Sequence, residues 1–228
     1  MNNIDLYYEV LKEIKDNPYD YLRNVSLSYL HLFTQGYDAC VLDSGICSRC
    51  FSERIPFDEF YSFVEKKYNV RLGERHYFSI IDFCEPNERK AFNKFFELLE
   101  EYKKNHYSKG KKKEKKALEG VKHAGFDELS IKAKHNMVLE NMRKRPKLYF
   151  KAPSLKYLET YQNGYVTCAK AYQLPFDYYH GFDVFVQEKY EVSIQKSAFE
   201  IIEFFNFYEE DAFYKFFDLL DEYLGQKG

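Results

Sequence analysis

Apolar residues recur along this chain with the spacing of amphipathic helices rather than the alternation of strands. The strongest pattern lies in residues 88–102, where apolar side chains follow i, i+3, i+4 and i+7. These apolar positions are Phe92, Phe95, Phe96, Leu99 and Tyr102. The outer face of the same stretch carries Glu97, Glu100 and Glu101. We therefore expect a helix that buries an aromatic face and exposes a carboxylate face.

Proline and serine residues mark the ends of further predicted helices. Asn17-Pro18 and Arg145-Pro146 should end the helices before them, because proline cannot continue a helix and restricts the residue that precedes it. Ser26 and Ser154 come directly before apolar runs and suit helix N-caps.

Two further helices are predicted to open at prolines. One should run from Pro56 to Tyr68 and the other from Pro175 to Tyr190. Gly36 and Gly164 lie within or near the end of the helices that follow the two serines. A glycine at that position suggests a close helix–helix approach or a turn.

The whole pattern is written twice. Pro18, Ser26, Gly36 and Cys40 recur 128 residues later as the residues Pro146, Ser154, Gly164 and Cys168. The register then slips, and the stretch 91–99 (AFNKFFELL) matches 212–220 (AFYKFFDLL). A repeat of this length exceeds the 20–50 residues typical of solenoid units. The sequence therefore predicts an all-α tandem duplication of a domain of roughly 100 residues, with about five helices in each copy.

Charge divides the chain into three parts. Residues 1–102 hold 12 Lys and Arg against 18 Asp and Glu, a formal charge of −6. Residues 103–133 hold 10 against 4, which gives +6, and residues 134–228 hold 12 against 14, which gives −2. We expect two acidic helical domains, 1–102 and 134–228, joined by a Lys-rich linker, 103–133, that is too polar to form a core.

Several classes of protein do not fit this sequence. No apolar run reaches the ~20 residues that span a bilayer, and the first residues lack the basic and apolar segments of a signal peptide. We therefore expect a cytoplasmic protein without a membrane partner. No catalytic motif of His, Ser, Asp or phosphate-binding Gly is recognisable, so the prediction is that the chain is not an enzyme.

The cysteines leave one alternative open. Cys47 and Cys50 form a CxxC within about six residues that the second copy lacks, and Cys40 lies seven residues earlier. A structural zinc site needs about four Cys or His ligands, so this set is incomplete unless the fold supplies another. We expect ordinary cysteines and no cofactor, with zinc at Cys40, Cys47 and Cys50 as the exception.

The acidic and tyrosine-rich positions are the predicted partner-binding residues. The chain has 22 Tyr and no Trp, and Tyr is enriched at protein interfaces. The predicted set consists of Asp43, Arg49, Glu53, Asp58, Glu59, Glu97, Glu100, Glu101, Tyr178 and Tyr179.

The core pattern resembles that of small helical immunity proteins from bacterial polymorphic toxin systems. The match is fullest in the second copy, at Arg145-Pro146-Lys147-Leu148-Tyr149, Ser154-Leu155, Leu158, Gly164-Tyr165 and Phe216-Phe217-Asp218-Leu219-Leu220-Asp221-Glu222-Tyr223. The first copy departs from it with Asn17 in place of the arginine, Asp20 in place of the leucine, and the CxxC insertion. The resemblance implies a helical fold and a cognate toxin as partner, but defines no catalytic site.

Three functional hypotheses follow. The first is a non-enzymatic inhibitor that binds a basic toxin, such as a nuclease, through acidic helical surfaces, because complementary charge speeds association. The second is a zinc- or nucleic-acid-linked regulator that uses the CxxC insertion and the lysine run. The third is a helical structural adaptor. We expect no nucleic-acid partner, because both flanking domains are acidic and the lysine run lacks aromatic residues for stacking.

Overall fold

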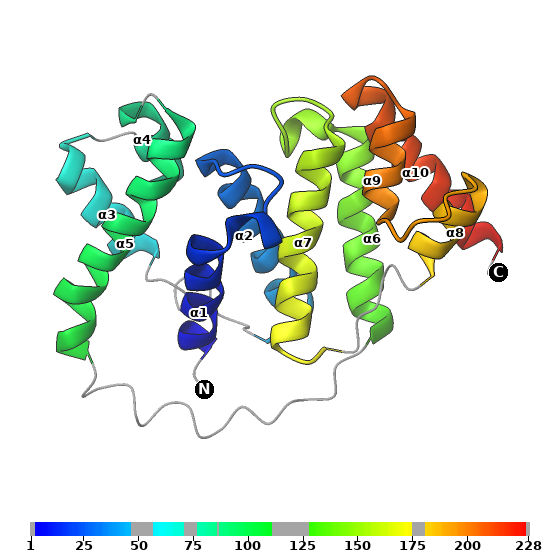
Figure 1. Ribbon diagram of the computed structural model, residues 1–228. Coiled ribbons are helices and arrows are strands. Elements are labelled where there is room, and N and C mark those ends of the chain that lie inside the picture. The colour runs from blue at the N-terminus through cyan, green and yellow to red at the C-terminus, as the bar shows by residue number, and fades with distance from the viewer. Residues whose placement is uncertain are drawn as a thin grey trace. The chain divides into compact units, whose positions relative to one another are not determined.

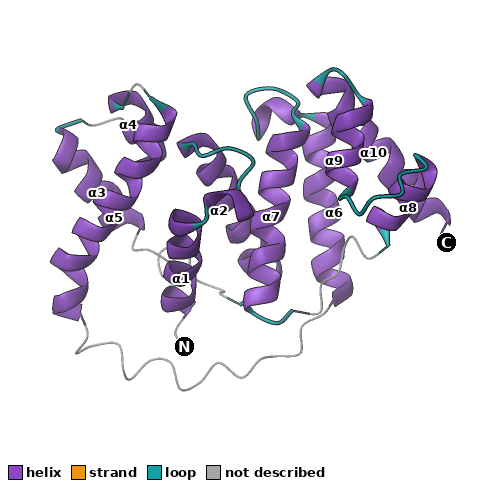
Figure 2. Ribbon diagram, viewed as in Figure 1, coloured by secondary structure: helices purple, strands orange, loops and turns teal. Residues whose placement is uncertain are grey.

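The fold is helical throughout the part of the chain that the computed structural model describes. These residues are 3–46, 57–70, 77–85, 87–110, 128–174 and 181–226, and no strand occurs among them (Figure 2). The predicted all-α class is therefore confirmed.

The same order of elements occurs in both halves of the sequence (Figure 1). The first half contains α1 (Asn3–Asp16), the 3₁₀ helix η1 (Pro18–Asp20), α2 (Leu27–Asp43), α3 (Phe57–Tyr68), α4 (Tyr77–Cys84) and α5 (Glu88–Gly110). The second half contains α6 (Glu128–Lys144), the 3₁₀ helix η3 (Pro146–Leu148), α7 (Leu155–Ala171), α8 (Phe182–Lys189), α9 (Ala198–Phe205) and α10 (Glu209–Gln226).

The structure divides into two compact units whose limits differ from the halves of the sequence. Unit 1 consists of residues 1–35 and 45–125, and unit 2 of residues 36–44 and 126–228. The second half of α2 therefore belongs with unit 2.

Helices α5 and α6 extend into the range 103–133 that was predicted as a linker, since α5 ends at Gly110 and α6 begins at Glu128. The boundaries at 102 and 134 stay a prediction.

The helix ends follow the local signals in the sequence. The hydroxyl of Ser154 accepts a hydrogen bond from the backbone N–H of Tyr157, and Ser26 does the same for Tyr29. Both serines are thus N-caps, as predicted. Pro18 and Pro146 each open a short 3₁₀ helix rather than only ending the helix before it.

One predicted boundary is wrong. The helix expected from Pro175 begins at Phe182, and residues 175–180 lie outside the described part of the chain. The N-cap of this helix is Gly181, whose φ of 79° is left-handed and cannot continue a right-handed helix. The helix is shorter than its counterpart α3, which spans Phe57–Tyr68, and the predicted first residue of α3, Pro56, lies outside the described residues.

Matching aromatic clusters form the cores of both units. In unit 1 the Phe60 ring lies 5.4 Å from that of Tyr102 and 6.1 Å from that of Phe95, and all three side chains are buried. In unit 2 the Phe182 ring lies 5.5 Å from that of Tyr223 and 5.6 Å from that of Phe216. These edge-to-face and tilted contacts bring α5 against α3 and α10 against α8, in the arrangement favoured by aromatic rings.

Candidate partner-binding surfaces

The predicted carboxylate face of α5 is present in unit 1. Glu97 and Glu100 are exposed and Glu101 is partly exposed, whereas the aromatic face of the helix is buried. Two of the three carboxylates form ion pairs: Lys94 Nζ lies 2.5 Å from Glu97 Oε2, and Lys67 Nζ lies 2.7 Å from Glu101 Oε1.

Helix α3 adds a fourth predicted carboxylate to unit 1. The exposed Glu59 accepts a hydrogen bond through Oε2 from the hydroxyl of the buried Tyr102, at 3.0 Å. This bond joins the Glu59 side chain of α3 to the aromatic face of α5. The structure therefore brings Glu59, Glu97, Glu100 and Glu101 onto two neighbouring helices of unit 1.

Helix α10 has a similar face in unit 2. Its exposed carboxylates include Asp218, Asp221 and Glu222. Arg143 of α6 donates to Asp221 at 2.6 Å and to Asp218 at 3.1 Å, and Lys189 of α8 pairs with Glu222. The hydrogen bond to Asp221 raises the pKa of Arg143. Exposed ion pairs of this kind add little to stability, so the charged face is not needed to hold the unit together.

Asp43 occupies a different setting, at the end of α2 within unit 2. Its Oδ2 accepts a hydrogen bond from the Tyr165 hydroxyl at 3.0 Å, and its backbone carbonyl accepts one from Lys134 Nζ at 2.9 Å. Burial raises the pKa of the Asp43 carboxyl, while the hydrogen bond from Tyr165 and the charge of Lys134 oppose this shift. Asp43 is half-buried, whereas Glu59, Glu97 and Glu100 of unit 1 are exposed.

A buried histidine extends this polar group. The His135 ring lies 4.0 Å from the Tyr165 ring, and its Nε2 is 3.0 Å from Gln162 Oε1. His135 is fully buried, and burial lowers its pKa to about 3 despite the hydrogen bond to Gln162. The imidazole is therefore neutral near pH 7, and its position between the helices α6 and α7 suits a structural role.

The remaining predicted residues are less informative. Cys40 is a free, fully buried cysteine on α2, and no group of three or more His, Cys, Asp or Glu side chains in the described ranges could hold a metal ion. The other predicted zinc ligands, Cys47 and Cys50, lie outside the described residues. So do the predicted binding residues Arg49, Glu53, Tyr178 and Tyr179, and the side chain of Asp58.

An exposed aromatic group was missed by the sequence reasoning. It lies where α9 ends and α10 begins, and it consists of Phe204, Phe205, Phe207 and Tyr208, which we call the aromatic corner. Phe204 is 82% exposed, Phe207 93% and Tyr208 64%. The helical periodicity of the sequence indicates this exposure, because Phe204 falls outside the apolar stripe of α9 that Phe199 and Ile202 define.

Comparisons of the chain with protein-family models, with curated proteins and with solved structures found no match. Within the described residues, no helix combines the length and the apolar character needed to cross a membrane.

Proposed function

We propose that this chain is a non-enzymatic binding protein that neutralises a basic protein partner, in the manner of an immunity protein that binds a cognate bacterial toxin. The observation that carries the proposal is the pair of carboxylate faces on α5 and α10. Each of these helices buries its aromatic side and exposes carboxylates, Glu on α5 and both Asp and Glu on α10. Such a surface attracts a partner rich in Lys and Arg and raises its rate of association.

The proposal includes the tandem duplication predicted from the sequence. Matching contacts in the two halves support this duplication. Lys67 pairs with Glu101 in unit 1, and Lys189 pairs with Glu222 in unit 2, at matching positions of the two halves. The backbone repeats as well: Asn69 and Glu191, which follow α3 and α8, have φ angles of 53° and 55°. Two copies of one domain would give the partner two related acidic surfaces.

The immunity proteins that this chain resembles are encoded beside their toxins. The test is therefore a binding measurement with the product of the neighbouring gene. Association should slow steeply as salt rises from 50 to 500 mM, because screening weakens long-range attraction between exposed charges. Replacing Glu97 and Glu100 by Gln should lower the association rate, whereas replacing Lys90 and Lys94 by Gln on the same helix should raise it. An association rate that does not depend on salt or on these charges would contradict the proposal.

The other two hypotheses stay predictions. Metal analysis of the purified protein tests the zinc-linked regulator, and a mobility-shift assay with DNA and RNA tests nucleic-acid binding through the lysine run. The structural adaptor differs from the inhibitor in one respect, because its partner should keep full activity in the complex.

A further inference from the structure

We propose that the aromatic corner of unit 2 is the anchor by which this protein holds its partner, and that the partner presents an apolar pocket rimmed by Lys and Arg. This inference rests on the proposed function and names the surface on which affinity depends. The predicted binding residues are acidic and tyrosine positions and Arg49, all elsewhere in the chain.

The aromatic corner is exposed although the local sequence is able to bury its other apolar residues. Helix α9 buries Ala198, Phe199, Ile201 and Ile202. Phe204 lies on the opposite face with Glu200 and Glu203, where a polar side chain is expected. Phe207 and Tyr208 follow in the turn to α10, with ring centroids 5.0 Å apart. The core does not require these side chains.

The backbone that carries the aromatic corner is well supported. Ser197 and Glu200 form a capping box at the start of α9, and the Asn206 side chain donates to the Ile202 carbonyl at 2.7 Å. The Ala212 N–H donates to the Tyr208 carbonyl at 3.0 Å as α10 begins. The Phe205 ring packs 4.7 Å from the Tyr190 ring. A turn held in this way loses little conformational entropy on binding, which favours affinity.

An exposed phenylalanine occupies the matching position of the first half. The sequence FSIIDF at 78–83 corresponds to FEIIEF at 199–204, so Phe83 matches Phe204. Phe83 lies in the last turn of the apolar-faced helix α4 and is 75% exposed. The two halves thus share an exposed ring and an acidic residue before it, Asp82 or Glu203, in addition to their core residues. Packing accounts for the shared core but not for a shared exposed ring.

Charge identifies the kind of partner. Residues 197–214 contain five carboxylates and no Lys or Arg. Lys156 of α7 lies 2.9 Å from Glu203 and 3.6 Å from Glu209, whereas Glu210 and Asp211 are exposed in the first turn of α10. The aromatic rings therefore sit within a mainly negative segment, which suits a positively charged protein and disfavours nucleic acid or an anionic membrane.

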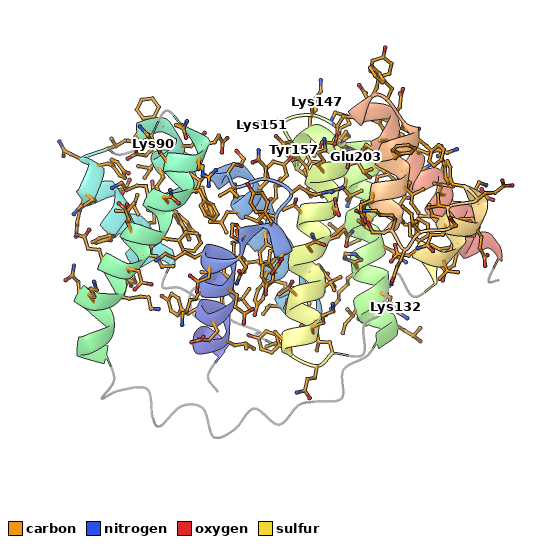
Figure 3. All side chains as sticks on the ribbon, in the orientation of Figure 1. Lys90, Lys132, Lys147, Lys151, Tyr157 and Glu203 are labelled. Atoms are coloured by element: carbon orange, nitrogen blue, oxygen red, sulfur yellow. The ribbon has the colours of Figure 1, made fainter. Side chains whose placement is uncertain are left out.

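Basic residues also lie at the end of unit 2 that carries Glu203. Lys147 and Lys151 lie toward the same end of unit 2 as Tyr157 and Glu203 (Figure 3), on the segment before α7. Together with the exposed Glu210 and Asp211 in the first turn of α10, these lysines give unit 2 charges of both signs. A partner that docks on the rings meets both, so the orientation of binding is fixed as well as its strength.

The size of the corner suits an anchor within a larger interface. Aromatic side chains each bury ~150–250 Å² on docking, so these four supply on the order of 500 Å² at their observed exposure. A stable interface buries about 800 Å² on each partner. The remainder would come from surrounding polar side chains, as expected when a few central aromatic residues carry most of the binding energy.

The test compares variants of the full chain in binding to the purified product of the neighbouring gene. Phe204→Ser with Phe207→Ser should raise the dissociation rate about 30-fold or more and change the association rate by less than about threefold. Glu210→Gln with Asp211→Asn should lower the association rate instead. Met137→Ser, which removes an exposed apolar side chain from α6, serves as the matched control and should change neither rate. Circular dichroism and urea unfolding check that each variant is folded.

The outcomes separate this inference from the function on which it rests. If the wild-type chain binds and the Phe204/Phe207 variant dissociates at the same rate, the aromatic corner is not the anchor, and the proposed function stands. If the wild-type chain does not bind, both are overturned. Three further measurements complete the test. They are sedimentation of the chain alone, binding to phosphatidylcholine vesicles, and binding to a 20-nucleotide single strand of nucleic acid. Self-association, vesicle binding or strand binding that is lost with Phe204 and Phe207 would assign the corner to that occupant and overturn the inference.

Discussion

Gly36 of α2 lies directly against the backbone of Tyr161 in α7, both within unit 2. A Cβ atom added to Gly36 would meet the Tyr161 carbonyl oxygen at 1.9 Å and its carbonyl carbon at 2.8 Å. The obstacle is backbone in the middle of a helix, which cannot rotate away as a side-chain tip can. The close helix–helix approach predicted from this glycine is therefore confirmed.

Gly36→Ala should destabilise the protein through this clash. The two helices must separate, and overpacking of this kind costs about 1–3 kcal/mol or more. Urea unfolding measures the loss as a lower midpoint. Gly225→Ala is the matched control, because a Cβ there has open space around it and the site lies within α10. Alanine should be neutral or stabilising at that position, by up to about 1 kcal/mol. Equal stability of the two variants would contradict the observed packing.

A glutamate in the first turn of the last helix supports the start of another helix in each half. Glu209 accepts hydrogen bonds from the Ser154 hydroxyl at 2.8 Å and from the Lys156 N–H at 2.9 Å. Glu88 accepts from the Ser28 hydroxyl at 2.7 Å and from the Ser28 N–H at 3.1 Å. Carboxylates at helix N-termini satisfy free N–H groups and complement the helix dipole.

Glu209→Ala and Glu88→Ala should each destabilise the protein, by about 1–2 kcal/mol, since each leaves helix N–H groups without their acceptor. Thermal and urea unfolding provide the measurement. Glu210→Ala, one residue further along α10 and exposed, should have an effect below about 0.5 kcal/mol. If Glu210→Ala is as costly as Glu209→Ala, the dipole alone explains the effect and the hydrogen bonds do not.

These two glutamates show what the sequence could predict and what it could not. The apolar spacing of α5 and α10 and the serine N-caps were readable, because each depends on residues close together in the chain. The link from Glu209 to Ser154 was not, because it joins residues 55 positions apart. The helix dipole is a local explanation for the acidic cluster that begins at Glu209, and nothing near it in the sequence predicts its role in capping α7.

The candidate binding surfaces were predicted to a similar extent. The outward face of α5 followed from helical periodicity, and exposure of Glu97 and Glu100 agrees with it. Asp43 could not be placed, because its half-buried position depends on Tyr165, which is 122 residues away. The aromatic corner was missed for a different reason: phenylalanine usually lies in a core, and Phe204 and Phe207 are exposed.

Tyr165→Phe should change both the stability of the protein and the titration of Asp43. The hydroxyl donates to the Asp43 carboxylate, and this bond opposes the rise of the Asp43 pKa that burial causes. Without it the pKa should rise further, as followed by carbon-13 NMR of the carboxyl group. Because a raised carboxyl pKa disfavours the charged form, the stability loss should be larger at pH 7 than at pH 4. We expect about 1.5–3 kcal/mol at pH 7. The control is Tyr214→Phe, on exposed α10 surface, and it should leave the Asp43 titration unchanged.

His135 should make the protein less stable as the solution becomes acidic. Burial lowers the pKa of this histidine from 6.5 to about 3 in the folded protein, so the unfolded chain binds the proton more readily. Stability is therefore fully present above about pH 6.5, and it is lost as the pH falls from there toward 3. Between pH 7 and pH 5 this one group should lower the free energy of unfolding by about 2 kcal/mol.

Urea unfolding at a series of pH values measures the loss, and His135→Gln should remove that part of the pH dependence. His31→Gln, in unit 1, controls for the loss of a histidine elsewhere. A His135→Gln variant whose stability falls with acid as steeply as the wild type would show that His135 is not neutral in the fold.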